Sequence, residues 1–147
     1  MIASISGTLK SISKSEIVLE VNSIGYLLNV SSKVISSLGD IGSNLSMFTD
    51  LQVKDDKIIM YGFFNQIDQT IFRLLQSVQG VGPKAALSIL SALVNLGYTR
   101  SEVFAIVMRI KKEFTLKQKS KDFTVGNIIP LALNALTQEN KWLVMMK

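Results

Sequence analysis

The sequence predicts an α+β fold in which a small closed β domain precedes a helical region. Up to residue 63, apolar residues alternate with polar ones in short β-branched runs; beyond it, they recur with the 3.6-residue period of amphipathic helices. The charge changes at the same place. Residues 1–63 carry five basic and six acidic groups, whereas residues 64–147 carry eleven and five. A basic second half favours a polyanionic partner.

The N-terminal region contains about five predicted strands and one helical turn. The opening strand is expected to bend at Gly7, since glycine inside a strand often marks a bend or a close approach. A helical turn at residues 31–38 is expected to end at Gly39. The predicted strands cover residues 1–9, 16–21, 26–30, 45–49 and 57–61. This profile is typical of a small Greek-key barrel such as the OB-fold, so residues 1–63 are predicted to form an OB-fold domain.

Asp55 and Asp56 lie between the last two predicted strands. Aspartate favours turns, so the simplest interpretation is a polar hairpin tip. Paired carboxylates also suit acid–base or magnesium chemistry. The sequence disfavours that role because Lys54 and Lys57 flank the pair and no third acid is near.

The helical region shows clear start and stop signals. Asn65 can cap a first helix, with Asp68 at its positive end. A second helix is expected from Pro83 towards Leu96 and to end at Gly97. Its predicted buried stripe consists of Leu87, Leu90, Val94 and the alanines.

A third helix follows a capping-box spacing between Thr99 and Glu102. Its predicted apolar face consists of Val103, Ile106, Val107 and Ile110. A last helix is expected to begin near Thr124, and an apolar tail follows at residues 142–146.

The corner between the first two helices is the candidate binding site. Gly80 and Gly82 bracket Val81, and Pro83 opens the next helix. Amide N–H groups at such a turn and helix start attract an anion, and Lys84 adds a full positive charge beside them. The predicted phosphate-binding residues are therefore Gly80, Val81, Gly82 and Lys84.

Two other interpretations of this corner stay open. Gly80, Gly82 and Ala85 match the spacing of a dinucleotide-binding fingerprint, with Glu102 about 20 residues further on. That fingerprint needs a strand before the first glycine, and here the approach is helical. The second alternative is a plain helix–turn–helix corner without a ligand.

Composition excludes several classes of site. The chain of 147 residues contains no cysteine and no histidine, which excludes disulfides, thiolate metal sites and the usual general base. No cofactor or metal is expected. The N-terminus does not look like a signal peptide and no run could span a bilayer, so a cytoplasmic protein without a membrane partner is expected.

These motifs resemble the RuvA family. The chain's Gly-Val-Gly-Pro-Lys corner matches the helix-hairpin-helix motif with which that family holds DNA phosphates, and the corner together with residues 61–63 is specific. The segments that carry the resemblance are residues 21–26, 48–49, 53–56, 61–63, 78–90, 93–98 and 100–103.

The resemblance implies a non-catalytic subunit that recognises four-way (Holliday) junction DNA and supports ATP-driven branch migration in recombination and repair. It implies an OB-fold domain at residues 1–63 that builds a homotetramer, and a helix-hairpin-helix domain at residues 64–96. A C-terminal helical domain at residues 97–147, sharing the helix at residues 83–96, would contact a RuvB-type motor ATPase. A RuvC-type resolvase is a further candidate partner. Asp55 and Asp56 would form the acidic pin near the crossover.

The chain departs from the family in one respect. A second hairpin and a linker, expected after the first hairpin, are missing, because residues 88–97 run directly into the predicted C-terminal domain. Either a natural internal deletion removed the second hairpin and the linker, or the sequence joins segments from the two sides of a missing stretch. The alternative function is therefore a degraded family member that keeps oligomer and motor contacts but binds DNA weakly. An enzyme is the third and least favoured option.

The basic run at residues 109–121 holds six basic residues and one acidic residue. A solvated loop between two helices is the favoured interpretation. The alternative is that Lys117, Lys119 and Lys121 supply additional phosphate contacts.

Overall fold

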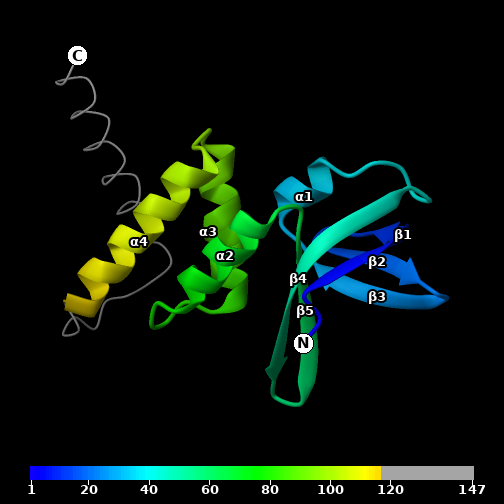
Figure 1. Ribbon diagram of the computed structural model, residues 1–147, viewed down its shortest axis with the longest axis horizontal. Helices are drawn as coiled ribbons and strands as arrows, with labels where there is room; N and C mark the ends of the chain where they lie inside the picture. Colours follow the sequence, from blue (N-terminus) through cyan, green and yellow to red (C-terminus); the bar gives the residue numbers. More distant parts are fainter. Residues whose placement is uncertain (117–147) are drawn as a thin grey trace. The chain divides into compact units, whose positions relative to one another are not determined.

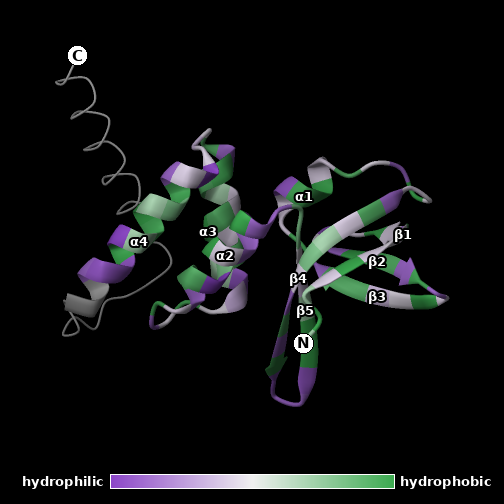
Figure 2. Cartoon of the chain, viewed as in Figure 1, coloured by the Kyte–Doolittle hydropathy of each residue, from purple (hydrophilic) through white to green (hydrophobic). Residues whose placement is uncertain are grey.

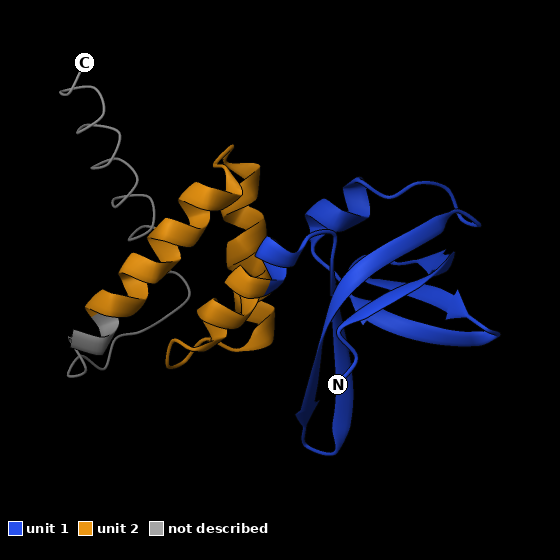
Figure 3. Cartoon of the chain, in the orientation of Figure 1, with its two compact units in different colours: residues 1–69 blue, residues 70–147 orange. Residues whose placement is uncertain are grey.

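The computed structural model describes residues 1–116, with side chains described up to residue 113. This part of the chain is α+β, with a five-stranded barrel followed by helices (Figure 1). Two compact units divide the chain at residues 69 and 70 (Figure 3). The predicted domain boundaries at residues 63 and 96 stay predictions. The predicted helix near Thr124 and the tail at residues 142–146 lie outside the described residues.

The strands form a closed barrel in the OB-like order β1-β2-β3-β5-β4. Their bounds are β1 Ser4–Ile12, β2 Glu16–Val21, β3 Ile24–Asn29, β4 Asn44–Lys54 and β5 Lys57–Phe63. The strand at residues 45–49 is longer than predicted, because β4 continues along β5 to the hairpin turn. The pairs are antiparallel except for one parallel bridge between Asn29 of β3 and Tyr61 of β5, which closes the barrel.

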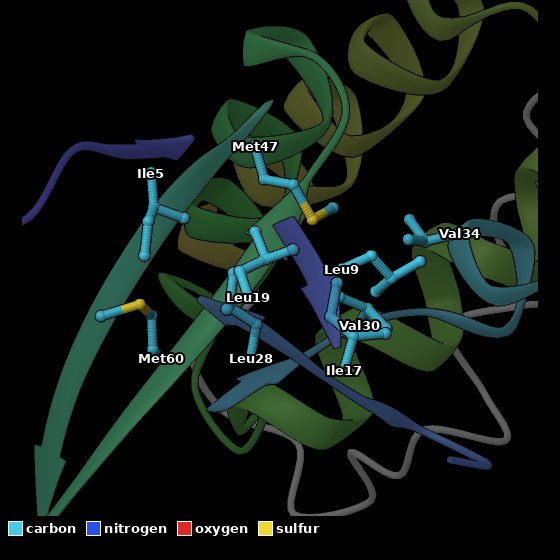
Figure 4. Packing of buried hydrophobic residues seen from close by; sticks show 9 residues of the cluster. All are labelled: Ile5, Leu9, Ile17, Leu19, Leu28, Val30, Val34, Met47 and Met60. Carbon is cyan, nitrogen blue, oxygen red and sulfur yellow. The ribbon is translucent and has the colours of Figure 1, made fainter. Parts of the chain in front are cut away.

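Alternating side chains from all five strands fill the barrel (Figure 4). Helix α1 (Ser32–Ser36) adds Val34 to this core, and the hydroxyl of Ser31 caps the helix by accepting from the Val34 amide at 3.2 Å. The predicted helical turn is thereby confirmed. The buried residues are Ile5, Leu9, Ile17, Leu19, Leu28, Val30, Val34, Met47 and Met60. Burial of each large side chain contributes about 1.5–3 kcal/mol.

Gly7 is required by the close approach of β1 and β2. A Cβ built there would lie 2.4 Å from the backbone oxygen of Glu20, which only a backbone shift could relieve. The β1–β2 register also shifts between Leu9 and Ser11, so the strand is irregular beyond the glycine. Bulges of this kind increase local twist and help a short sheet to close.

Helix α2 (Gln66–Gln76) begins as predicted. Asn65 accepts a hydrogen bond from the Asp68 amide at 2.8 Å, and its side-chain amide donates to the Asp68 carboxylate at 3.1 Å. Gln69, 5% exposed, donates to the Thr49 carbonyl at 2.6 Å. The start of α2 is thus fastened to β4 within the first unit.

Helices α3 (Pro83–Asn95) and α4 (Arg100–Leu116) belong to the second unit. The predicted apolar face of α4 is confirmed, since Val103, Ile106, Val107 and Ile110 are all buried. The predicted stripe of α3 is partly wrong. Its buried residues are Ala86, Ile89, Leu90 and Leu93, while Leu87 and Val94 are half-buried. No helix in residues 1–116 is both long and apolar enough to span a membrane.

Candidate nucleic-acid interface

The turn between α2 and α3 is a tight, hydrogen-bonded corner. The Val78 amide donates to the Leu75 carbonyl at 3.1 Å, and the Val81 amide donates to the Val78 carbonyl at 3.1 Å. Gly80 lies between them with φ of +85°, a conformation that other residues adopt only with strain. The glycine therefore allows the chain to reverse within six residues.

Two buried valines hold this corner in place, while the residues between and after them are exposed to solvent. Val78 and Val81 are each 6% exposed, whereas Gly80, Gly82 and Lys84 are exposed. Val81 thus stays in the predicted site as an apolar anchor. It does not offer a free amide, because its N–H already bonds within the turn.

The start of α3 has unsatisfied donors. Gly82 is the N-cap in extended backbone (φ −84°, ψ 177°), Pro83 follows, and no side chain caps the helix. Within residues 1–116, the amides of Gly82, Lys84 and Ala85 have no hydrogen-bond acceptor. The first turn holds no acidic residue and carries Lys84, so the positive end of the helix dipole and a full charge coincide there.

The start of α4, unlike that of α3, is capped by side chains of the chain itself. The Glu102 carboxylate accepts from the Thr99 amide at 2.8 Å and from its hydroxyl at 3.0 Å, while that hydroxyl accepts from the Glu102 amide at 3.3 Å. This is the predicted capping box. A carboxylate of the chain itself already occupies the anion position, so of these two helix starts only that of α3 is open to an external anion.

Asp55 and Asp56 form the tip of the β4–β5 hairpin. Both are exposed and have positive φ, +48° and +62°, as a two-residue type I′ turn requires. Lys54 pairs with Lys57 across the strands directly behind them. Among residues 1–116, no group of three or more Asp, Glu, His or Cys side chains that could hold a metal ion is present. The β2–β3 turn has the same geometry with Asn22 and Ser23, at +49° and +65°.

The basic run is partly helical, contrary to the prediction of a loop. Helix α4 continues to Leu116, and Ile106, Val107 and Ile110 are buried along its apolar face. Arg109 and Lys112 are exposed on that helix. Lys117, Lys119 and Lys121 lie outside the described residues.

Two buried polar residues of β4, Thr49 and Asp50, were not predicted. Thr49, fully buried, donates its hydroxyl to the Ile2 carbonyl at 2.6 Å. Asp50 is 7% exposed beside Tyr61, its cross-strand partner, and accepts from Gln52 at 3.0 Å. Burial, and then the nearby Asp50 carboxylate, raise the pKa of Tyr61. The only sequence signal was a threonine–aspartate pair inside an apolar strand.

Comparison with known proteins supports the motif-based resemblance. Residues 1–62 match the family model of the RuvA N terminal domain. Curated relatives named Holliday junction branch migration complex subunit RuvA include those of Chloroherpeton thalassium, Rhizobium meliloti and Acetivibrio thermocellus. They are 43%, 39% and 43% identical over 93 residues. Each match covers 63% of this chain and 45–46% of the relative, so the chain matches about half the length of these proteins.

Proposed function

We propose that this chain, whose residues 1–62 belong to the RuvA N-terminal domain family, is a non-catalytic subunit that binds four-way DNA junctions. Its role would be to present the junction to an ATP-driven partner during branch migration. The observation that carries the proposal is the open start of α3, where free amides and Lys84 coincide on an exposed surface.

The α2–α3 corner is suited to phosphate rather than to bases. Backbone amides and a lysine bind phosphate oxygens without reading sequence, so the contact positions DNA without specifying it. Each neutralised phosphate adds about 0.9 to the slope of log affinity against log salt. Several subunits acting together would multiply this effect.

Asp55 and Asp56 would act in the opposite sense. Two carboxylates at the end of an exposed hairpin repel phosphates, by about 1 kcal/mol per pair of unit charges at 4 Å in water. At a four-way junction this repulsion would help to keep the strands of different arms apart. Attraction at the α2–α3 corner and repulsion at the β4–β5 tip thus favour a branched DNA over a continuous duplex.

The assembly and partners are part of the same proposal. A homotetramer would offer one binding corner to each arm of the junction. The C-terminal helices would contact a RuvB-type motor, and a RuvC-type resolvase is a further candidate. The sequence lacks a Gly-x-x-x-x-Gly-Lys-Ser/Thr loop, so ATP hydrolysis is assigned to the motor. A cytoplasmic location, where the junction DNA and the motor would be encountered, is part of the same proposal.

One observation favours the alternative, an oligomerisation and motor-contact module with weak DNA binding. Helix α3 runs unbroken from the first hairpin to Asn95, and the next helix start is closed by Glu102. Within residues 70–116, each chain therefore offers one open helix start, and affinity per subunit should be low.

A direct comparison of DNA forms separates the two functions. Four-way, duplex and single-stranded DNA with the same arm sequences would be titrated by gel shift and by fluorescence anisotropy. A preference for the four-way form supports junction recognition. Equal, weak binding to all three forms supports the interaction module.

A further inference from the structure

The side chain of Gln69 takes the place of a strand at one point on the edge of β4. Strand β1 pairs with β4 as far as Ser4 and Phe48. At the next position the Thr49 amide still donates to the Ala3 carbonyl at 2.9 Å, but the return bond of an antiparallel pair, from the Ala3 amide to the Thr49 carbonyl, is not made. The Thr49 carbonyl accepts instead from the Gln69 side-chain amide, at 2.6 Å.

This hydrogen bond lies in a buried and fully paired environment. Gln69 and Thr49 are both buried, and the Thr49 hydroxyl is also used, since it donates to the Ile2 carbonyl at 2.6 Å. Among the described residues, every buried side-chain nitrogen and oxygen has a hydrogen-bond partner. A buried carbonyl that loses its donor is destabilising, so an apolar side chain at position 69 could not replace the amide without a cost.

Helix α2 is attached to the barrel at two points. The first is covalent, because only Phe64 and Asn65 lie between the end of β5 and the start of α2. The second is the bond from Gln69 to β4. Figure 2 shows the first turn of α2 as mostly hydrophilic, and within residues 66–69 Gln69 is the buried residue. A helix joined only through its preceding residues could turn about them, whereas a second attachment one turn further along restricts that rotation.

The same helix leads to the α2–α3 corner at its other end. From Gln69 the helix continues to Gln76, about 10 Å along the axis at 1.5 Å per residue, and the corner follows. Hydrogen bonds from amides to phosphate oxygens need donor–acceptor distances of about 2.7–3.2 Å. A change in the direction of α2 that moves the corner by more than about 1 Å would therefore break such contacts with a DNA held elsewhere on the protein.

We propose that Gln69 is a positioning residue for junction recognition: its bond to Thr49 sets the direction in which α2 leaves the barrel. The inference rests on the proposed function, in which four-way DNA meets both the α2–α3 corner and the Asp55–Asp56 tip. Duplex DNA needs the corner alone. If only about a tenth of the chains held the corner and the tip in the competent arrangement, affinity for four-way DNA would fall about tenfold, while affinity for duplex DNA would stay the same.

The test compares two variants that each lose one buried hydrogen bond at Thr49. Gln69→Met keeps a long, helix-favouring side chain but has no N–H to donate. Thr49→Val is the matched control, because it removes the hydroxyl that donates to Ile2 and keeps the carbonyl that accepts from Gln69. Both variants should melt about 2–6 °C below the unmodified chain. Only Gln69→Met should lower the ratio of four-way to duplex affinity, by about tenfold.

A distance measurement tests the same role without DNA. The chain contains no cysteine, so Ser15→Cys and Ser88→Cys, at two exposed positions, place one spin label in each compact unit. Labelled chain is diluted with unlabelled chain, so that each measured distance lies within one molecule. Pulsed electron paramagnetic resonance should give a narrow distance distribution for this labelled background and for Thr49→Val, and a broader distribution for Gln69→Met.

The labelled background decides the inference even if Gln69→Met does not fold, since a narrow distribution supports it and a broad one overturns it. An unchanged affinity ratio in folded Gln69→Met also overturns it. So does an equal loss of that ratio in Thr49→Val, which would reduce the effect to stability. Failure of the unmodified chain to bind four-way DNA would instead contradict the proposed function, while the spin-label distances would still test whether Gln69 directs α2.

Discussion

Glu102 accepts two hydrogen bonds from Thr99, one from its amide at 2.8 Å and one from its hydroxyl at 3.0 Å. The start of α4 is therefore satisfied by the chain itself. The start of α3 has neither a side-chain cap nor an acidic residue. The α2–α3 corner, where we propose that phosphate binds, therefore keeps amides that no side chain of the described residues caps.

A side chain that caps the start of α3 should raise the stability of the fold and lower its affinity for DNA. Gly82 is an N-cap in extended backbone, and a Cβ there would meet no atom within 4 Å. Gly82→Asp should therefore add a cap and stabilise α3 by a few tenths of a kcal/mol to about 1 kcal/mol. It should also weaken junction binding, because the new carboxylate would occupy the phosphate position. Urea unfolding and anisotropy titration measure the two effects. Higher stability with unchanged DNA affinity would place the phosphate elsewhere.

The tip carboxylates can be removed without changing the turn. Asn22 and Ser23 adopt the same conformation in the β2–β3 hairpin, so Asp55→Asn/Asp56→Ser transfers a turn that this barrel already folds. Stability should stay within about 0.5 kcal/mol, as for surface substitutions. Duplex DNA should bind more tightly and the preference for four-way DNA should fall, since repulsion is lost. An unaltered ratio of the two dissociation constants would exclude an electrostatic role for the pair.

Gly7 should tolerate no side chain. Its Cβ position lies 2.4 Å from the Glu20 backbone oxygen, so Gly7→Ala must displace β1 from β2. We expect a loss of about 3 kcal/mol, at the upper end for overpacked sites. Gly39→Ala is the control, because the nearest atom there is the Ser43 hydroxyl oxygen at 3.4 Å. Comparable thermal stability of the two variants would show that the strands can separate at little cost.

Tyr61 should make the fold sensitive to alkali. Burial and Asp50 raise its pKa above the ordinary value of 10.0, so the folded chain keeps the phenolic proton where the unfolded chain loses it. The contribution is complete below pH 10 and decreases as the pH rises through the folded-state pKa. Tyr61→Phe should flatten the fall in unfolding free energy above pH 10 relative to the unmodified chain. Equal slopes for Tyr61→Phe and the unmodified chain would assign alkaline unfolding to other groups.

Much of the fold could be predicted because local signals agreed with the tertiary structure. The capping box between Thr99 and Glu102 and the cap at Asn65 depend on three-residue spacings, and both are present. The buried face of α3 could not be predicted. That helix has apolar residues on nearly every side, so periodicity did not distinguish Leu87 from Ile89, and packing against α4 decided it.

The site was only partly accessible to sequence reasoning. Spacing located the α2–α3 corner, but it did not show that the Val81 amide is consumed by the turn while those of Lys84 and Ala85 stay available. The bond between Gln69 and Thr49 was also missed. In sequence Gln69 looks like any polar residue of an amphipathic helix, and only the tertiary structure shows that it is buried and donates to a strand.

The salt dependence of four-way junction binding tests the central claim most directly. The unmodified chain, Lys84→Gln and the control Lys14→Gln, which removes an exposed lysine from the β1–β2 turn, would be titrated across a range of salt concentrations. Lys84→Gln should lower the affinity and reduce the slope of log affinity against log salt by about 0.9 for each bound subunit, while Lys14→Gln should match the unmodified chain. Identical slopes and affinities for Lys84→Gln and the unmodified chain would contradict the account.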